Sequence, residues 1–311
     1  MVGASQRNSR GDPGWIRWVL IWLGCLLAWP SVMACCVETL SAAEIESGLM
    51  EQDFYQYDFL RPGYLGTFEQ VQSTGYDSGQ IFKNISVNYL AMVTGPSFQG
   101  GALGQREYFN LRNFLGAGYR LGETLTFSGN ANWSVRGTDQ FLTQFHDPFF
   151  RLADSSVFSA DGWNLYWDGR LHLPFSKSSM VSGMNLGVQS VQALTYSIPE
   201  SRLAVGLSSS IRYNFLNPMG VGSDLELYLG PNVFYQLAPS LGLNLLTEVQ
   251  WSHLYQQGFS DWTHPNFDLE PGLAWDLFPN LSFNPFVHLP VGSKTSLIPS
   301  YVGFLLSWTL L

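Results

Sequence analysis

The sequence of 311 residues contains little charge and almost no cysteine. Only 13% of its residues are Asp, Glu, Lys or Arg, whereas a soluble domain carries about 25%. All three cysteines, Cys25, Cys35 and Cys36, lie within the first 36 residues. The rest of the chain therefore has no disulfide framework, no thiolate metal site and no cysteine nucleophile.

Basic residues are scarce as well, with 15 Lys+Arg against 24 Asp+Glu and a net charge of −9. This balance lacks the basic surface that nucleic-acid binding requires, so no nucleic-acid partner is expected. The aromatic share of 15% excludes a disordered chain. Glycine and aromatic residues are plentiful where helix formers are few, which favours short strands and tight turns.

The first 43 residues have the organisation of an export signal. Arg7, Arg10 and Arg17 precede an apolar run from Trp18 to Ala34, as in a secretory signal peptide. Two cleavage positions fit, after Ala34 and after Ala43, and we favour the second. A retained membrane anchor and a lipidated Cys35 are the alternatives.

No later run is long and apolar enough to cross a membrane as a helix, and apolar and polar residues alternate instead. Such alternation predicts strands with one apolar and one polar face. It is clearest in four segments, 125–136, 163–173, 203–215 and 225–235.

The polar faces of these segments differ from those of a soluble β-sandwich. A face in bulk water would be rich in Lys and Glu, but Lys83, Lys177 and Lys294 are the only lysines in the chain. Asn, Ser, Thr, Gln and Gly occupy the polar faces instead. Lipid outside and a polar lumen inside explain this pattern. The fold class is therefore predicted as all-β, a closed antiparallel transmembrane β-barrel over residues 84–311, because an open sheet edge in lipid would leave backbone groups unpaired.

Twelve strands are predicted, of which 148–157 is the weakest because its alternation is poor. It is included for a topological reason. Four short turns should all be periplasmic, since the longer loops of such barrels are extracellular, and they agree only if this strand is counted. The turns are Gly122-Glu123, Pro199-Glu200, Ala238-Pro239-Ser240 and Pro279-Asn280.

The aromatic residues provide a second indication, because the outward-facing ones fall at strand ends. In this topology Trp133, Tyr213, Phe215 and Trp251 form an extracellular girdle. A periplasmic girdle would contain Tyr119, Phe127, Trp163, Tyr196, Tyr235, Trp275 and Trp308. Amphipathic rings prefer both membrane interfaces.

With this pattern the chain resembles Gram-negative outer-membrane β-barrels of the porin and channel class over residues 84–311. The resemblance implies a location in the outer membrane, contact with its lipid and insertion by its assembly machinery. Members of the class often end in an aromatic residue, whereas this chain ends in Leu311.

Charged residues predicted to face the lumen are separated by sign along the chain. Arginines lie on the early strands, at Arg112, Arg120, Arg136, Arg170, Arg202 and Arg212, with Asp168 as the one acid. Acids lie on the later strands, at Asp224, Glu226, Glu248, Asp268, Glu270 and Asp276. In a closed barrel these become a basic arc and an acidic arc, whose field would orient dipolar or zwitterionic solutes in a pore. Alternatively, the arcs pair across a filled lumen.

Residues 44–83 precede the barrel and are acidic and rich in Tyr and Phe. Residues 45–60 are compatible with a short helix ended by Arg61-Pro62-Gly63. The segment is predicted either to enter the basic arc as a plug or to remain in the periplasm.

The expected function is passage or export of small polar solutes. A structural or adhesive barrel with a plugged lumen is the alternative. A hydrolase at the rim, similar to the omptin proteases, is a third option, with His146, Asp147, His253, Asp261 and His264 as candidates. The five histidines lack metal-ligand spacing and no glycine-rich loop opens a helix, so no catalysis, metal or cofactor is expected.

Overall fold

The computed structural model describes residues 84–95, 109–137, 141–258, 262, 266–291 and 300–310. The predicted signal peptide 1–43, the segment 44–83 and Leu311 lie outside these residues. The strands are β1 (Ile85–Thr94), β2 (Phe109–Arg120), β3 (Leu125–Gly137), β4 (Phe141–Phe145), β5 (Phe149–Ala160), β6 (Trp163–His172), β7 (Met184–Ser197), β8 (Leu203–Leu216), β9 (Ser223–Ala238), β10 (Leu241–Leu254), β11 (Asn266–Phe278), β12 (Leu281–Pro290) and β13 (Tyr301–Thr309).

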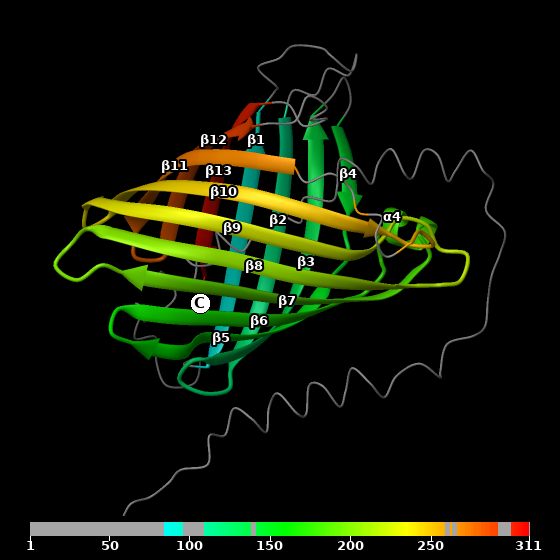
Figure 1. The fold of residues 1–311 in the computed structure, drawn as a ribbon, viewed down its shortest axis with the longest axis horizontal. Helices are drawn as coiled ribbons and strands as arrows, with labels where there is room; N and C mark the ends of the chain where they lie inside the picture. Colours follow the sequence, from blue (N-terminus) through cyan, green and yellow to red (C-terminus); the bar gives the residue numbers. More distant parts are fainter. Residues whose placement is uncertain are drawn as a thin grey trace, which may run out of the picture. The chain divides into compact units, whose positions relative to one another are not determined.

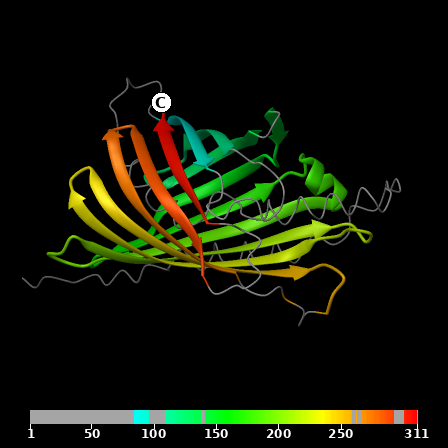
Figure 2. The same ribbon diagram turned by 90° about the horizontal axis from the view of Figure 1, so that it is seen from above.

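The strands form one antiparallel sheet that closes on itself (Figure 1). Closure is made by β1 and β13, which pair from Asn88 opposite Thr309 to Thr94 opposite Gly303. Figure 2 shows the strands curving around one interior. Closure leaves no edge strand exposed to lipid, where unpaired backbone groups would cost several kcal/mol each.

Thirteen strand segments among the described residues occupy twelve positions around the barrel. β5 pairs with the first half of β3, from Leu125 to Asn130, and β4 pairs with the second half, from Trp133 to Gly137. β4 and β5 are therefore two pieces of one interrupted wall strand. The predicted count of twelve is confirmed, and the weak strand at 148–157 is β5.

The short turns meet at one end of the barrel, which we call the short-turn end (Figure 1). They connect β2 to β3, β5 to β6, β7 to β8, β9 to β10 and β11 to β12. The β5–β6 turn consists of Asp161 and Gly162, both with positive φ (52° and 84°), as a tight type I′ hairpin requires. All four turns predicted to share one side of the membrane lie at this end.

The two faces of each strand differ as the alternation predicted. On β10, Leu245 points outward with 38% of its surface exposed, whereas its neighbour Leu246 points inward and is fully buried. On β8, Ile211 is 52% exposed beside the buried Ser210. Many inward side chains are polar, although Leu246 and a buried apolar cluster of Leu90, Met92, Phe114, Phe149, Phe286 and Leu305 also occupy the interior. The outward side chains are mostly apolar, and a membrane provides their apolar surroundings.

Outward aromatic residues gather at the short-turn end. Strand register places Tyr119 opposite Phe127, and Trp163 opposite Tyr196 with ring centroids 4.6 Å apart. The exposed rings of Tyr235, Trp275 and Trp308 belong to the same level of the barrel. This arrangement agrees with the predicted periplasmic girdle.

One helix was not predicted, α4 (Lys177–Val181), in the connection between β6 and β7. It begins after Ser176, whose side chain accepts a hydrogen bond from the N–H of Ser179 (3.2 Å), a common N-cap arrangement. Gly183, with φ of 72°, lies just beyond its end. Five residues are too few for a recognisable helical periodicity. No helix in the described part of the chain is long and apolar enough to cross a bilayer.

Candidate functional site: a polar pocket in the barrel lumen

The break between β4 and β5 consists of His146, Asp147 and Pro148. Proline has no N–H to donate to a ladder, and here the wall strand is interrupted. The break is held against β3, because the N–H of His146 donates to the carbonyl oxygen of Asn132 (3.0 Å). Asn132 in turn donates from Nδ2 to the carbonyl oxygen of Asp147 (3.1 Å).

The carboxylate of Asp147 fixes the segment that contains α4. Its Oδ1 accepts hydrogen bonds from the N–H groups of Phe175 (2.8 Å) and Ser176 (2.7 Å), and its Oδ2 accepts one from the hydroxyl of Ser179. Hydrogen bonds to an ionised acceptor are stronger than neutral ones. Asp147 therefore joins the interrupted wall strand to the helix.

A pocket of about 90 Å³ lies in the lumen beside α4. Arg112 on β2 and Arg212 on β8 both line it, although these strands lie far apart around the barrel. Serine residues of the α4 segment, Asn132, His146, His172 and Glu226 complete much of its polar wall. The pocket thus spans the interior between two parts of the wall.

On the β8 side, Arg212 is positioned by its neighbours. Its Nε donates to Oδ1 of Asn214 (3.0 Å), while Nδ2 of Asn214 donates to the carbonyl oxygen of Ser223 (3.0 Å). Strand register places Glu226 directly opposite Arg212. A positive and a negative side chain therefore lie next to each other where the basic arc meets the acidic arc.

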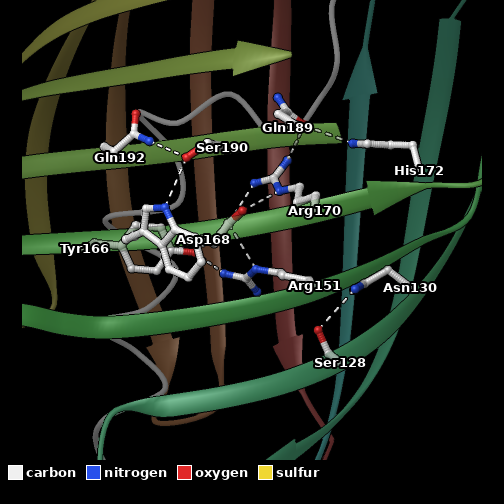
Figure 3. A network of polar contacts seen from close by, with 11 residues as sticks. Ser128, Asn130, Arg151, Tyr166, Asp168, Arg170, His172, Gln189, Ser190 and Gln192 are labelled. Carbon is white, nitrogen blue, oxygen red and sulfur yellow. Dashed lines mark hydrogen bonds and ion pairs between the residues drawn. The ribbon is translucent and has the colours of Figure 1, made fainter. Parts of the chain in front are cut away.

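Asp168 lies between two arginines on the wall formed by β5 and β6 (Figure 3). Nε and Nη2 of Arg170 donate to its two oxygens (2.7 and 2.9 Å), and Nε of Arg151 donates from β5 (3.0 Å). The Tyr166 hydroxyl donates to the same carboxylate (2.6 Å). Asp168 and the Arg170 side chain are inaccessible to solvent, so this cluster depends on its mutual pairing.

The network continues from this cluster toward the pocket. Nη1 of Arg170 approaches Oε1 of Gln189 (3.5 Å), which also hydrogen-bonds to Nε2 of His172 (3.0 Å) (Figure 3). The ring of Phe149 lies against both Arg170 and His172. His172 therefore connects the buried ion pairs to the pocket wall.

The acidic side of the lumen contains a second buried cluster. Nδ1 of His288 on β12 is 2.7 Å from Oε1 of Glu270 on β11, and its Nε2 is 3.7 Å from Oδ1 of Asp268. The ring of Tyr301 stacks on the imidazole. Along β9 and β10, the hydroxyl of Tyr228 donates to Glu248 (2.8 Å). Across the described ranges, no three His, Cys, Asp or Glu residues are arranged to hold a metal ion.

The predicted lumen-facing charges occupy three kinds of position. Arg112, Arg212 and Glu226 line the pocket. Arg170, Glu248, Asp268 and Glu270 are buried on the inner face, and Arg136 is half-buried at the pocket level of β3. Arg120, Arg202 and Asp276 are exposed near the short-turn end. Their roles in a pore remain predictions.

Asp224 lies beside an irregularity in the sheet. The pairing of β9 with β10 shifts register between His253 and Leu254, and Nδ1 of the buried His253 is 2.6 Å from Oδ1 of Asp224. The lumen-facing position of Asp224 stays a prediction.

Several residues of the interior were not among the predicted ones. Arg151 was missed because its neighbours on the inner face of β5, Phe149 and Ala153, are apolar and buried, so the strand has no polar series that marks its inner face. Nothing in the sequence singled out His288 except its inward position in the alternation of β12. From the sequence, His146 and Asp147 were candidates only for a hydrolase site at the rim. In the structure they interrupt the wall strand together with Pro148.

Among the described residues, the candidates for a hydrolase at the rim do not form one site. His146 hydrogen-bonds through Nε2 to the buried hydroxyl of Ser134 (2.9 Å), and Asp147 binds the α4 segment. His253 pairs with Asp224 and contacts the ring of Trp262. Asp261 and His264 lie outside the described residues.

Comparison with known proteins supports the fold. No protein-family model and no curated protein matches the chain. A solved outer membrane channel from Pseudomonas putida F1 is similar with a TM-score of 0.52 and 9% identity, over 73% of this chain and 95% of that one. The KdgM porin (TM-score 0.44, 10% identity, 72% and 98%) and OmpF of Salmonella typhi (TM-score 0.41, 6% identity, 74% and 99%) also align.

A closed antiparallel barrel with an apolar outer face and many polar side chains inside defines the class of outer-membrane β-barrels. The chain belongs to this class by its own geometry, and its fold is porin- or channel-like. At such low identity the similarity concerns the fold alone.

Proposed function

We propose that the barrel is a channel for the passage or export of small polar solutes across the outer membrane. The observation that carries the proposal is the polar pocket that reaches from Arg112 on β2 to Arg212 on β8 inside a closed wall. A lumen lined by polar groups provides a hydrated route, while the apolar outer face keeps the barrel in lipid.

The separation of charge inside the barrel supports a dipolar or zwitterionic solute. The arginines inside the barrel come from β2, β5, β6 and β8, and are Arg112, Arg151, Arg170 and Arg212. The acids come from β9 to β11, and are Glu226, Glu248, Asp268 and Glu270. Opposite charges on opposite sides create a transverse field, which is strong where the dielectric constant is low.

Conductance of the refolded full-length protein in a planar lipid bilayer tests the proposal. We expect discrete channel steps, which Ser210→Trp reduces because Ser210 is buried on the inner face. Ile211→Trp is the matched control, since the neighbouring side chain points outward. Folded protein that inserts but produces no steps under any applied voltage would contradict a channel.

A structural or adhesive barrel with a filled lumen is the second candidate. The ion pairs of Asp168 and the buried pair of His288 and Glu270 favour it, because both occupy interior space. In that case Ser210→Trp would alter the thermal stability of the barrel rather than its conductance.

A further inference from the structure

We propose that α4 and the neighbouring β8–β9 turn dock on the lipid interface at the end of the barrel opposite the short-turn end (Figure 1). Residues 175–182 and 217–220 form this surface, which we call the α4 platform. Phe175, Met180 and Met219 enter the boundary of the hydrocarbon, and Lys177 lies against the phosphates of anionic lipid headgroups. The inference requires the membrane location of the barrel and does not depend on solute passage.

The platform presents apolar side chains to its surroundings. Met219 is 74% exposed and Phe175 is 66% exposed, which makes them the two most exposed large apolar side chains in the described part of the chain. Met180 is 59% exposed. Apolar surface is unfavourable in water, so three such side chains on one short platform indicate an interaction surface.

The two sides of α4 differ in polarity. Ser176, Ser179 and Ser182 are buried and line the pocket, whereas Lys177 and Met180 are exposed. Because residues three apart lie on the same side of a helix, the serine side faces the pocket and Met180 is directed away from it. A surface helix in water has the opposite arrangement, with its apolar side toward the protein. The arrangement of α4 is that of a segment with apolar surroundings.

The platform continues the lipid-facing surface of β6. Leu171 and Leu173 are exposed in the outward series of this strand, and Phe175 follows at the same spacing of two. His172 and Ser176, in the alternate series, are buried. The exposed ring of Phe175 therefore extends a surface that lipid already covers.

The depth of Phe175 follows from strand register. Trp163 lies opposite Tyr196, which lies opposite Val205, so the outward rows of β6 and β8 are in line at the short-turn end. A strand crosses the hydrocarbon core in about 9–11 residues. Counted from this row, the opposite boundary falls near Phe215 on β8 and just before Phe175, at the level where interfacial rings are favoured.

Hydrogen bonds hold Met219 in place beside α4. The N–H of Val221 donates to the carbonyl oxygen of Ser182 (3.0 Å), which joins the β8–β9 turn to the end of the helix. Nε2 of Gln256 donates to the carbonyl oxygen of Pro218 (3.1 Å). Two neighbouring segments thus fix the turn that exposes Met219.

Lys177 provides the charge that distinguishes lipid from another occupant. It is the only lysine among the described residues, and it is exposed between Phe175 and Met180. The apolar stem of a lysine lies along hydrocarbon while its ammonium group reaches the polar layer, where anionic phosphates attract it. Lysine is depleted at protein–protein interfaces, so the combination favours a lipid interface over a second barrel.

Spin labelling of the full-length protein in lipid vesicles tests the docking. The native cysteines are first replaced by serine, at Cys25, Cys35 and Cys36. Single nitroxides are then placed by Phe175→Cys, Met180→Cys or Met219→Cys, and these exposed positions lose no buried contact. We expect each label to collide with oxygen, which dissolves in lipid, and to be shielded from a water-soluble nickel chelate.

Two further labels define the scale of this measurement. Leu245→Cys, on the outer face at mid-strand, is the lipid reference, and Glu123→Cys, in an exposed turn, is the water reference. The platform labels should be shifted from the water reference toward the lipid reference. Labels that match Glu123→Cys would place the platform in water and overturn the proposal. Spin–spin broadening between labels of different barrels would assign the surface to a second copy and overturn it as well.

The headgroup contact is tested in phosphatidylcholine vesicles with and without phosphatidylglycerol. The anionic lipid should increase the shielding of the label at Met180→Cys, and Lys177→Gln should reduce its preference for lipid over water by about fivefold. Arg202→Gln, at the short-turn end, is the matched control and should change nothing. A Lys177→Gln variant that behaves like this control would overturn the phosphate contact. A barrel with shielded labels but no conductance would lose the channel and retain the platform.

Discussion

The carboxylate of Asp147, in the break between β4 and β5, accepts a hydrogen bond of 2.7 Å from the N–H of Ser176, the residue that caps α4. A wall strand and the helix of the β6–β7 connection thus meet through one side chain. The interrupted strand supplies the acceptor, and the loop after β6 supplies the donors.

Replacing this carboxylate should release α4 before it affects the barrel. Asp147→Ala removes an ionised acceptor of three hydrogen bonds, so we expect a local loss of about 1–3 kcal/mol. Hydrogen exchange should show faster exchange at Met180, whose N–H donates to the carbonyl oxygen of Ser176. Glu123→Ala, in an exposed turn at the short-turn end, is the control. Unchanged protection at Met180 would show that α4 does not depend on Asp147.

The facing of β10 allows a paired test of membrane orientation. Leu245→Arg places a charge on the outer face at mid-strand, which should cost about 2–4 kcal/mol of unfolding free energy in lipid. Asn244→Arg places the same side chain at the same depth on the polar inner face and should cost much less. Denaturant unfolding in lipid vesicles measures both, and equal losses would disprove the assignment of the two faces.

The buried pair of Asp168 and Arg170 should contribute strongly when one partner is removed. Arg170→Met leaves Asp168 with Arg151 as its remaining cationic partner, and breaking a buried pair costs about 3–5 kcal/mol. Asp168→Asn combined with Arg170→Met should lose less than the sum of the single changes, because neither charge remains alone. Additive losses in the double-mutant cycle would mean that the pairing is not coupled.

The charge arcs predict ion selectivity if the lumen conducts. Glu226→Gln with Glu270→Gln should shift the reversal potential toward anions, and Arg170→Gln with Arg212→Gln toward cations. Both shifts should fade at molar salt, where the screening length is about 3 Å. Arg202→Gln should behave like the unmodified protein, since this side chain lies at the exposed end. A selectivity indifferent to both double variants would exclude the arcs as its origin.

Sequence alternation was sufficient to predict the barrel, the strand count and the facing of β3, β8 and β10, because a period of two decides which side chains meet lipid. It was less informative where the pairing is irregular or where the inner face of a strand is apolar. The pairing of β9 with β10 shifts register next to Asp224, and on β5 the inward neighbours of Arg151, Phe149 and Ala153, are apolar, so no polar series marked its face.

The candidate site was only partly predictable. Arg112, Arg212 and Glu226 were expected to face the lumen, and they line its pocket. Their meeting in one pocket depends on the curvature of the barrel, which brings β2 and β8 together across the interior. The contribution of α4 depends on contacts of Asp147 more than 25 residues along the chain, and no local pattern contains that information.

The pairing of β13 with both β12 and β1 has a consequence for biogenesis. The strand β1 finds its second neighbour only in β13, a strand of nine residues that follows it by more than 200 positions in the chain. A chain that stopped before Tyr301 would leave β1 and β12 with unpaired backbone groups, which lipid does not solvate. Stable residence in the membrane therefore reports that synthesis and export of the barrel sequence have reached the end of β13.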